Sequence, residues 1–571
     1  MAFAAPVAEQ RFVLDQVVGL PELAATEMFA AASEDVVDAV LEGAGQFAEG
    51  EWAPLAKVGD TIGAQWTVDG VVMPAGYPEA YRAYVEGGWG TIGAPEAWGG
   101  QGLPFALQTA VLETLGGANT GFALCPTLTV GAIEALQHHG SPEQQALYLP
   151  HLATGEWTGT MNLTEPQAGS DVGALRTMAT PRGDGRWSIK GTKIYISFGD
   201  HDMAPNIVHL VLARTPDAPP GTRGISLFLV PKYRLDADGK PGTFNDVRVV
   251  SIEHKMGLHA SPTCVLSFGD HDDCLGELIG PEHGGLRAMF TMMNNARLNV
   301  GLQGVQIAEG ATQGAVAYAL DRVQSARAGS PDKAPIRIVD HPDVRRMLLR
   351  MKAQTQAARA LVYYAAGQVD RATLGDAAAK GRLELVTPLA KAHATDLGNE
   401  VASIGIQVHG GMGYIEETGA ARFFRDARIT PIYEGTNGIQ AADLVGRKLG
   451  LENGAVFAAL IADIRADAKA AGLVELVEAC DAAGRRLATA DADDKLAASY
   501  PFLTMLSVAT CGWLMEREAA AATGDDDFAT MKRASARFYL EQIVPEALGL
   551  VAAANASAEA LYAVPAEMFA A

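Results

Sequence analysis

The sequence contains few cysteines, and their spacing excludes the structures that cysteines usually build. Its 571 residues include only 5 cysteines, at positions 125, 264, 274, 480 and 511, and no two of them form a CxxC pair. An odd number of scattered cysteines does not fit a disulfide framework or a structural zinc site. We therefore expect buried free thiols in a reducing cytoplasm. The first residues also lack the basic and apolar regions of a secretory signal.

Basic residues are scarce as well. Lys and Arg number 44 against 67 Asp and Glu, which gives a formal net charge of -23. Such a charge opposes attraction to nucleic acid phosphates and to anionic lipid. The longest charge-free run of interest, from Thr114 to Ile133, contains several glycines, Asn119 and Pro126. We interpret this run as a helix, a turn and a helix inside the protein, and expect neither nucleic acid nor membrane as a partner.

The sequence carries no complete signature for a nicotinamide cofactor, a nucleoside triphosphate, zinc or a serine nucleophile. The glycine-rich loop at residues 97–103 follows no strand, so we interpret it as a turn between helices. The tetrapeptide Gly-Asp-His-Asp occurs twice, at residues 199–202 and 269–272. A metal site is the alternative there. Neither copy is followed by further ligand spacing, and we expect two loops and no metal.

The residue patterns divide the chain into four segments. With 49% hydrophobic and 19% charged residues the chain is globular, and 571 residues are too many for a single core. Helical spacing dominates residues 1–157, and short apolar runs in residues 158–278 predict an antiparallel β-barrel. Helical periodicity returns in residues 279–450, where His341-Pro342 starts an amphipathic helix, and an Ala-rich helical domain occupies residues 451–571. The predicted fold is therefore α+β and multidomain.

Glu434 is the strongest single candidate for a catalytic residue. It lies in the segment 431–440, next to Ile432, Tyr433 and Gly435. A poorly hydrated carboxylate has a raised pKa, which makes it a usable proton acceptor near neutral pH. From the residues alone, the alternative is a glutamate that caps a helix.

Two earlier segments extend this pattern. Residues 158–171 read Thr-Gly-Thr-Met-Asn-Leu-Thr-Glu-Pro-Gln-Ala-Gly-Ser-Asp, and residues 193–199 read Lys-Ile-Tyr-Ile-Ser-Phe-Gly. In this order, ahead of the Glu434 segment, they resemble the acyl-CoA dehydrogenase flavoprotein family, and the resemblance extends from Trp89 to Gly450. It implies noncovalent FAD as cofactor and an acyl-CoA thioester as substrate. It also implies the family's fold, with an N-terminal helical domain, a middle β-barrel and a helical bundle, here followed by an additional C-terminal helical domain.

The resemblance implies three groups of binding residues. The first meets the flavin ring and its phosphate side: the backbone of Met161 and Leu163, then Thr164, Gly169, Ser170, Tyr195 and Ser197. The second meets the adenine and pyrophosphate of the FAD in a neighbouring subunit: Arg322, Gln407, Gly410 and Gly411, with Thr436 and Asn437 as a further pyrophosphate contact. The third meets the CoA thioester: Ser170, Arg297 and Gly435. The chain departs from the family pattern after Ser197 and after Arg322, where Gly-Ser-Pro is inserted.

The resemblance also implies a reaction and partners. Glu434 removes the α-proton of the thioester while a hydride leaves the β-carbon, and an electron-transfer flavoprotein takes up the electrons. The extended ends and residues 201–210 are most similar to bacterial members that act on 3-methylthiopropanoyl-CoA, and a general short- to medium-chain acyl-CoA dehydrogenase is the alternative. Because the second group belongs to a neighbour's cofactor, we expect a homodimer. A nucleic-acid-binding relative, which the acidic last domain opposes, and an oxidase are further alternatives.

Overall fold

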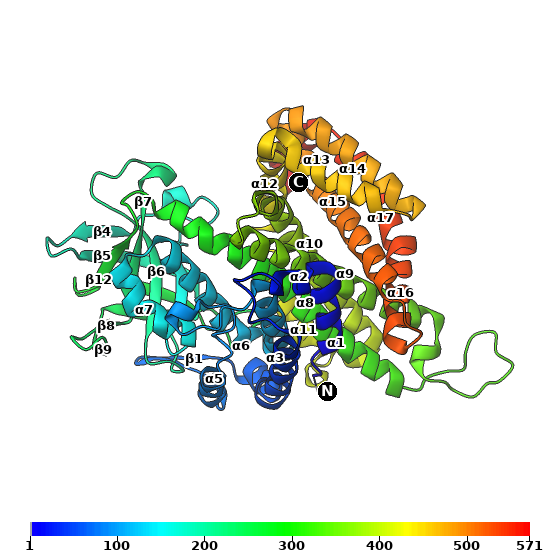
Figure 1. Ribbon diagram of the computed structural model, residues 1–571, viewed down its shortest axis with the longest axis horizontal. Coiled ribbons are helices and arrows are strands. Elements are labelled where there is room, and N and C mark those ends of the chain that lie inside the picture. The colour runs from blue at the N-terminus through cyan, green and yellow to red at the C-terminus, as the bar shows by residue number, and fades with distance from the viewer. Residues whose placement is uncertain (1–2) are drawn as a thin grey trace. The chain divides into compact units, whose positions relative to one another are not determined.

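The computed structural model describes residues 3–571, and its internal contacts divide the chain into two units (Figure 1). One unit comprises residues 42–296, and the other joins residues 3–41 to residues 297–571. The divisions fall inside helices α3 (Glu34–Phe47) and α8 (Gly285–Asp321). The α+β multidomain architecture expected from the sequence is confirmed, with a sheet between two helical regions of the chain.

The helices of residues 42–296 precede its sheet. They are α4 (Ala56–Ile62), α5 (Tyr77–Glu86), α6 (Phe105–His139) and α7 (Pro142–Thr154). The glycine-rich loop at 97–103 lies between α5 and α6, as predicted. The prediction of an all-helical N-terminal segment is wrong at one place, because β1 (Gln65–Thr67) and β2 (Gly70–Val72) form an antiparallel hairpin. Strands of three residues are too short to show a period of two, and only the Asp69-Gly70 turn could have indicated them.

Helix α6 contains the break that the sequence predicted. Asn119 has a non-helical backbone inside it, with φ -156° and ψ 86°. The Asn119 side-chain amide donates to the Tyr77 hydroxyl at 3.0 Å, and its carbonyl accepts from the Phe122 N–H at 3.3 Å. These bonds satisfy polar groups that the interruption leaves in a buried place, so two helices continue through one kink.

The sheet has eight strands in the order β10-β11-β5-β12-β7-β6-β3, with β4 beside β5 and β6 (Figure 1). They are β3 (Thr158–Asn162), β4 (Met178–Pro181), β5 (Trp187–Ser197), β6 (Ile207–Arg214), β7 (Ile225–Pro231), β10 (Val247–Ile252), β11 (Thr263–Phe268) and β12 (Leu275–Ile279); β8 (Tyr233–Leu235) and β9 (Pro241–Phe244) form a separate hairpin. Most pairs are antiparallel, but β6 runs parallel to both β3 and β4. The expectation of a purely antiparallel sheet is therefore wrong at β6.

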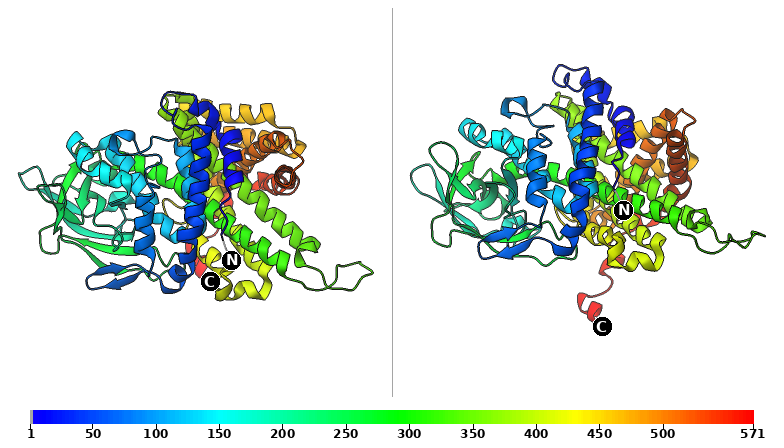
Figure 2. Two further views of the ribbon diagram at one scale, coloured as in Figure 1. Left: turned by 60° about the horizontal axis from the view of Figure 1, so that its bottom comes forward. Right: turned by 90° about the horizontal axis from the view of Figure 1, so that it is seen from below.

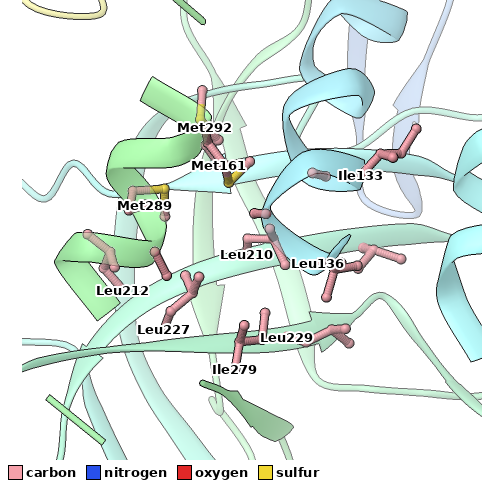
Figure 3. Close-up of a cluster of buried hydrophobic side chains, with 14 of the residues drawn as sticks. Ile133, Leu136, Met161, Leu210, Leu212, Leu227, Leu229, Ile279, Met289 and Met292 are labelled. Carbon is pink, nitrogen blue, oxygen red and sulfur yellow. The ribbon is translucent and has the colours of Figure 1, made fainter. Parts of the chain in front are cut away.

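Methionines and leucines fill the core of this unit (Figure 3). Leu136 from α6, Leu210 from β6 and Leu227 from β7 are all fully buried, and Met289 from the first turns of α8 completes the cluster. Met161 of β3 also belongs to it and is only 8% exposed. Because its side chain is used in the core, only the backbone of Met161 remains for another partner.

The second unit is helical in the residues that the structure describes. Its helices are α1 (Val7–Val13), α2 (Leu20–Ala24), most of α8, α9 (Pro342–Thr373), α10 (Ala377–His409), α11 (Ala420–Ala427), α12 (Asn437–Gly446), α13 (Ala455–Asp467), α14 (Ala471–Thr489), α15 (Ala492–Ala521), α16 (Asp527–Phe538), α17 (Val544–Leu548), α18 (Val551–Ala554) and α19 (Glu559–Tyr562). Helix α9 begins at Pro342, as predicted, and buries Met347, Leu348 and Met351. The loop between α8 and α9 projects from its helices in every view (Figures 1 and 2).

A cluster of buried charges joins the two ends of the chain. Lys532 of α16 donates to Glu9 of α1 at 3.0 Å and to Glu518 of α15 at 2.8 Å. All three side chains are at most 9% exposed. Removing one partner of such a cluster leaves the others buried without compensation, so the N-terminal helix is held firmly against the last helices.

Candidate functional site

Glu434 lies in the turn between α11 and α12. Its backbone is in the left-handed region with φ 54°, and Gly435 follows with φ 85°. A non-glycine residue in this region is strained, and such strain is concentrated at functional positions. The side chain of Thr436 caps α12 by accepting from the Ile439 N–H at 3.2 Å. The alternative in which Glu434 caps the helix is therefore wrong, because Thr436 does so.

Two basic side chains act on the Glu434 carboxylate. Burial raises the pKa of Glu434 above its ordinary value of 4.5, and the positive charges of Arg297 and Lys391 oppose this rise. Burial also lowers the pKa of Lys391, to about 8, although the charge of Glu434 opposes that shift. A carboxylate whose pKa is moved toward neutrality is suited to accept a proton at physiological pH.

Arg297 and Gly435, both expected near the thioester, are neighbours of each other. Arg297 is 6% exposed and lies 3.8 Å from the carboxylate of Asp443. A Cβ added at Gly435 would lie 2.8 Å from the Gln440 amide nitrogen and 3.8 Å from the Arg297 guanidinium. A side chain does not fit at Gly435 without movement of Gln440. Contact of Arg297 and Gly435 with CoA stays a prediction.

The polar groups of the Asn437 side chain are hydrogen-bonded to other residues of the protein. Its side-chain oxygen accepts from Lys391 at 2.9 Å, and its amide donates to Asp396 at 2.9 Å and to the Ala392 carbonyl at 3.1 Å. Its backbone N–H donates to the Pro431 carbonyl at 2.9 Å. These bonds hold the Glu434 turn on α10, and contact of Asn437 with the pyrophosphate stays a prediction.

The residues expected at the flavin ring come together on the sheet. The Thr164 carbonyl accepts from the Ile194 N–H at 2.9 Å, which places the segment after β3 on β5. The register of β5 and β11 shifts beside Tyr195, whose φ is 59° and whose side chain is 60% exposed. Such a bulge turns a side chain out of the strand's regular alternation. Leu163, which precedes Thr164, and Ser197, two residues after Tyr195, are half-buried, and Gly169 and Ser170 are exposed.

Two buried residues beside this segment, Lys193 and Glu165, were not identified from the sequence. Lys193 donates to Glu165 at 2.8 Å and to the Leu163 carbonyl at 3.0 Å, and its side chain is fully buried. Glu165 also accepts from the Thr177 N–H at 3.0 Å. Burial alone would raise the pKa of Glu165, but Lys193 and these hydrogen bonds lower it to about 2. Strand alternation placed Lys193 on the same face as exposed Tyr195, so the pattern gave no signal of its burial.

The residues expected at the adenine and pyrophosphate also lie together, in the helical unit. The ring of Tyr318, one turn before Arg322, stacks on His409 with the centroids 4.5 Å apart. Arg322, Gln407, Gly410 and Gly411 are exposed around this stack.

The glycines at both groups leave open space. A Cβ at Gly169, Gly410 or Gly411 would meet no atom of the described residues within 4 Å, and Gly410 has φ 60°. Bare, exposed backbone lets phosphate or ring edges approach closely. The residues of each unit therefore fit the part of a flavin dinucleotide expected there.

The histidines of the two Gly-Asp-His-Asp copies make hydrogen bonds in loops beside the ends of strands. His201 is buried and hydrogen-bonds to the Thr158 hydroxyl at 2.9 Å, and His271 pairs with Asp246 at 3.0 Å. Among residues 3–571 no group of three or more His, Cys, Asp or Glu side chains is arranged to hold a metal ion. Over the same range, every helix is too short or too polar to cross a bilayer.

Four family models match successive parts of the chain. They are the acyl-CoA dehydrogenase N-terminal domain over residues 35–156, middle domain over residues 160–271 and C-terminal domain over residues 283–449, and the acetyl-CoA dehydrogenase C-terminal like domain over residues 454–565.

Curated relatives match almost the whole chain. The 3-methylmercaptopropionyl-CoA dehydrogenase of Ruegeria pomeroyi is 45% identical, over 96% of this chain and 97% of its own length. A butyryl-CoA dehydrogenase of Syntrophomonas wolfei is 37% identical, over 94% of each chain. Among solved structures, Caenorhabditis elegans ACDH-11 in complex with C11-CoA has a TM-score of 0.77 at 21% identity, over 95% of this chain and 92% of that one. This last likeness shows a shared fold that includes the added C-terminal helices.

Proposed function

The chain belongs to the acyl-CoA dehydrogenase family, and on that premise we propose that it dehydrogenates 3-methylthiopropanoyl-CoA to its 2,3-unsaturated thioester with Glu434 as catalytic base. The observation that carries the choice of substrate is the 45% identity, over 96% of the chain, to the Ruegeria pomeroyi enzyme. The choice of base depends on the raised pKa of Glu434 and its strained turn.

The family is FAD-dependent, and bound FAD supplies the acceptor for the hydride that leaves the β-carbon. Glu434 takes the α-proton, and the new O–H bond keeps this proton on its carboxyl. Within residues 3–571 no acceptor is hydrogen-bonded to the backbone N–H of Glu434. This N–H is therefore available to the thioester oxygen, where negative charge develops as the α-proton leaves.

The segment expected at the flavin is held by hydrogen bonds within its own unit. Lys193 and Glu165 fix the turn that carries Leu163, Thr164 and Ser170 against β5. This turn would hold the ring through its backbone, and Tyr195 at the bulge would lie against the bound ring.

A general short-chain acyl-CoA dehydrogenase is the second candidate, because the Syntrophomonas wolfei relative is 37% identical over 94% of the chain. Substrates that differ by a sulfur or a methylene are separated by about 1–3 kcal/mol in an apolar pocket. A direct comparison of the two thioesters is therefore needed.

We also propose that the protein works as a homodimer in the cytoplasm and passes electrons to an electron-transfer flavoprotein. Beside the exposed Gly410 and Gly411, the side chains of Met412, Tyr414 and Ile415 are 50%, 85% and 45% exposed. Apolar side chains gathered beside expected cofactor contacts fit a surface that a second copy covers. The five cysteines of the described chain are buried and free, which fits a reducing compartment.

The test is anaerobic flavin bleaching with 3-methylthiopropanoyl-CoA and with butanoyl-CoA. We expect the first to reduce the flavin faster at subsaturating concentration. Glu434→Gln keeps the volume but removes the proton acceptor, so flavin reduction should fall by about 10²–10⁴-fold while FAD and thioester still bind. The matched control is Glu417→Gln, at an exposed glutamate of the preceding turn. Near-normal bleaching by Glu434→Gln would place the base elsewhere.

A further inference from the structure

Asn437 connects the Glu434 turn to one face of α10. It lies three residues after Glu434 and is 3% exposed. Its amide group binds Lys391, Thr395 and Asp396, which occupy successive turns of that face. The position of the turn therefore depends on where this face of α10 holds Asn437.

Lys391 is the member of this group that acts on the base. Its ammonium is buried and donates to a neutral amide oxygen, that of Asn437, at 2.9 Å. Its charge therefore remains available to Glu434, on which it acts electrostatically. A small change in the placement of Asn437 moves Lys391 relative to the carboxylate, and in a poorly hydrated place such a change has a large electrostatic effect.

The far end of the network belongs to the added C-terminal helices. Tyr500 of α15 donates its hydroxyl to Asp396 at 2.7 Å, and the other oxygen of that carboxylate accepts from Asn437 at 2.9 Å. One carboxylate oxygen of Asp396 thus accepts from the C-terminal helices and the other from the segment that follows Glu434. The result is a continuous series of hydrogen bonds from Tyr500 through Asp396 and Asn437 to Lys391.

We propose that Tyr500 is a positioning residue for Glu434, acting through Asp396 and Asn437, so that the C-terminal helices take part in the proton transfer. This inference depends on the proposed role of Glu434 as base. It gives the last domain a role in the reaction at Glu434.

The charges around the base come from several elements. Arg297 of α8 and Lys391 of α10 act on Glu434, and Glu434 in turn raises the pKa of the neutral Tyr433 hydroxyl beside it. Behind them, Asp396 acts on Lys391 and Arg428 acts on Asp396. Asp443 of α12 and Arg447, the residue after this helix, act on Arg297. Tyr500→Phe removes none of these charged side chains, and its direct effect is on Asp396, whose pKa the Tyr500 hydroxyl lowers. A change in the pH profile of that variant therefore reports a change that starts at Asp396 and reaches Glu434 through Asn437 and Lys391.

The experiment measures flavin reduction by butanoyl-CoA and by 3-methylthiopropanoyl-CoA in the FAD-bound enzyme across pH. For Tyr500→Phe we expect unchanged FAD content and little change in the half-saturating thioester concentration. The rate of flavin reduction should fall about 3- to 10-fold. The acid limb of the pH–rate profile, where the rate falls because Glu434 becomes protonated, should move to higher pH by about half a unit. The upward direction follows because Lys391 lowers the pKa of Glu434, and a displaced Lys391 lowers it less.

Two further variants complete the test. Tyr562→Phe makes the same chemical change at a 71% exposed tyrosine of the last domain and should behave as wild type. Asp396→Asn should lower the rate at least as much as Tyr500→Phe, because it also removes a charge that raises the pKa of Lys391. The double variant should lose no more than Asp396→Asn alone, because both substitutions break the same series of bonds.

The outcomes separate this inference from the proposed function. A normal rate and pH profile in Tyr500→Phe, or losses that add in the double variant, overturn the role of Tyr500, and a lower melting temperature alone does the same. Glu434→Gln, measured beside them, decides the base. If it bleaches normally the proposed function fails, whereas slow bleaching of Glu434→Gln with a normal Tyr500→Phe removes only this inference.

Discussion

Lys193 and Glu165 form a fully enclosed ion pair, with 2.8 Å between the ammonium nitrogen and a carboxylate oxygen and at most 4% of either side chain exposed. The same ammonium binds the Leu163 carbonyl at 3.0 Å. One lysine therefore determines both the charge balance and the path of the segment expected at the flavin.

Lys193→Met should destabilise the protein and weaken FAD binding together. It leaves the Glu165 carboxylate buried without its cation, and loss of one partner of a buried pair costs about 3–5 kcal/mol. The free energy of unfolding from urea titration and the flavin content after gel filtration measure the two effects. Lys190→Met is the control, because Lys190 lies on the same strand with an exposed partner, Asp272. Stable Lys193→Met protein with full flavin content would contradict this role.

The Glu165 pair should also appear in acid stability. The pKa of Glu165 is lowered from its ordinary value of 4.5 to about 2 in the folded protein, so its ionised form stabilises the fold above about pH 4.5. This contribution is lost as the pH falls toward 2. The difference in unfolding free energy between wild type and Glu165→Gln should therefore be largest at neutral pH and shrink below pH 4.5. A difference that is constant from pH 7 to pH 3 would show that Glu165 is not ionised in the fold.

Arg297→Met should move the acid limb of flavin reduction to higher pH. Arg297 lowers the pKa of Glu434, so its removal raises that pKa and the base is ionised only at higher pH. A nearby guanidinium shifts a carboxyl pKa by about 1–3 units, which sets the expected size of the shift. Arg297→Lys keeps the charge and should stay close to wild type. An unmoved limb with weaker thioester binding would instead assign Arg297 to CoA.

Gly435→Ala should slow flavin reduction more than it affects folding. Gly435 has φ 85°, and an added Cβ would lie 2.8 Å from the Gln440 amide nitrogen. A non-glycine residue in this conformation costs about 1–3 kcal/mol, and relief of the strain moves the adjacent base. Gly438→Ala, where the nearest atom would be 3.7 Å away, serves as the control. Equal rates in the two variants would show that the turn tolerates a side chain.

Much of the architecture followed from the sequence because it depends on local patterns. Pro342 predicted the start of α9, and Asn119 lies in the stretch predicted to contain a break in α6. The pairing of strands could not be predicted in the same way, because the parallel neighbours of β6 lie far from it in the chain. No local pattern records such contacts.

Some residues of the candidate site could be identified from the sequence, and others could not. Glu434 was identifiable because an acidic residue among apolar neighbours is conspicuous in the sequence. Lys391 was not, since its helix gives no local sign that position 391 faces the base. The side-chain partners of Asn437 were not identifiable either, because they lie more than 40 positions earlier in the chain. Motifs identify the residue type at a site, whereas the partners of each residue are fixed by tertiary packing.

The ion pair between Glu9 and Lys532 has a consequence for biosynthesis. Residues 42–296 form a continuous unit, which a nascent chain can fold soon after it leaves the ribosome. The other unit includes both ends of the chain. Helix α1 emerges before the continuous unit, yet Lys532, which donates to Glu9, emerges more than 200 residues after that unit is complete. A helix made before the continuous unit therefore receives its buried partner only long after that unit can fold.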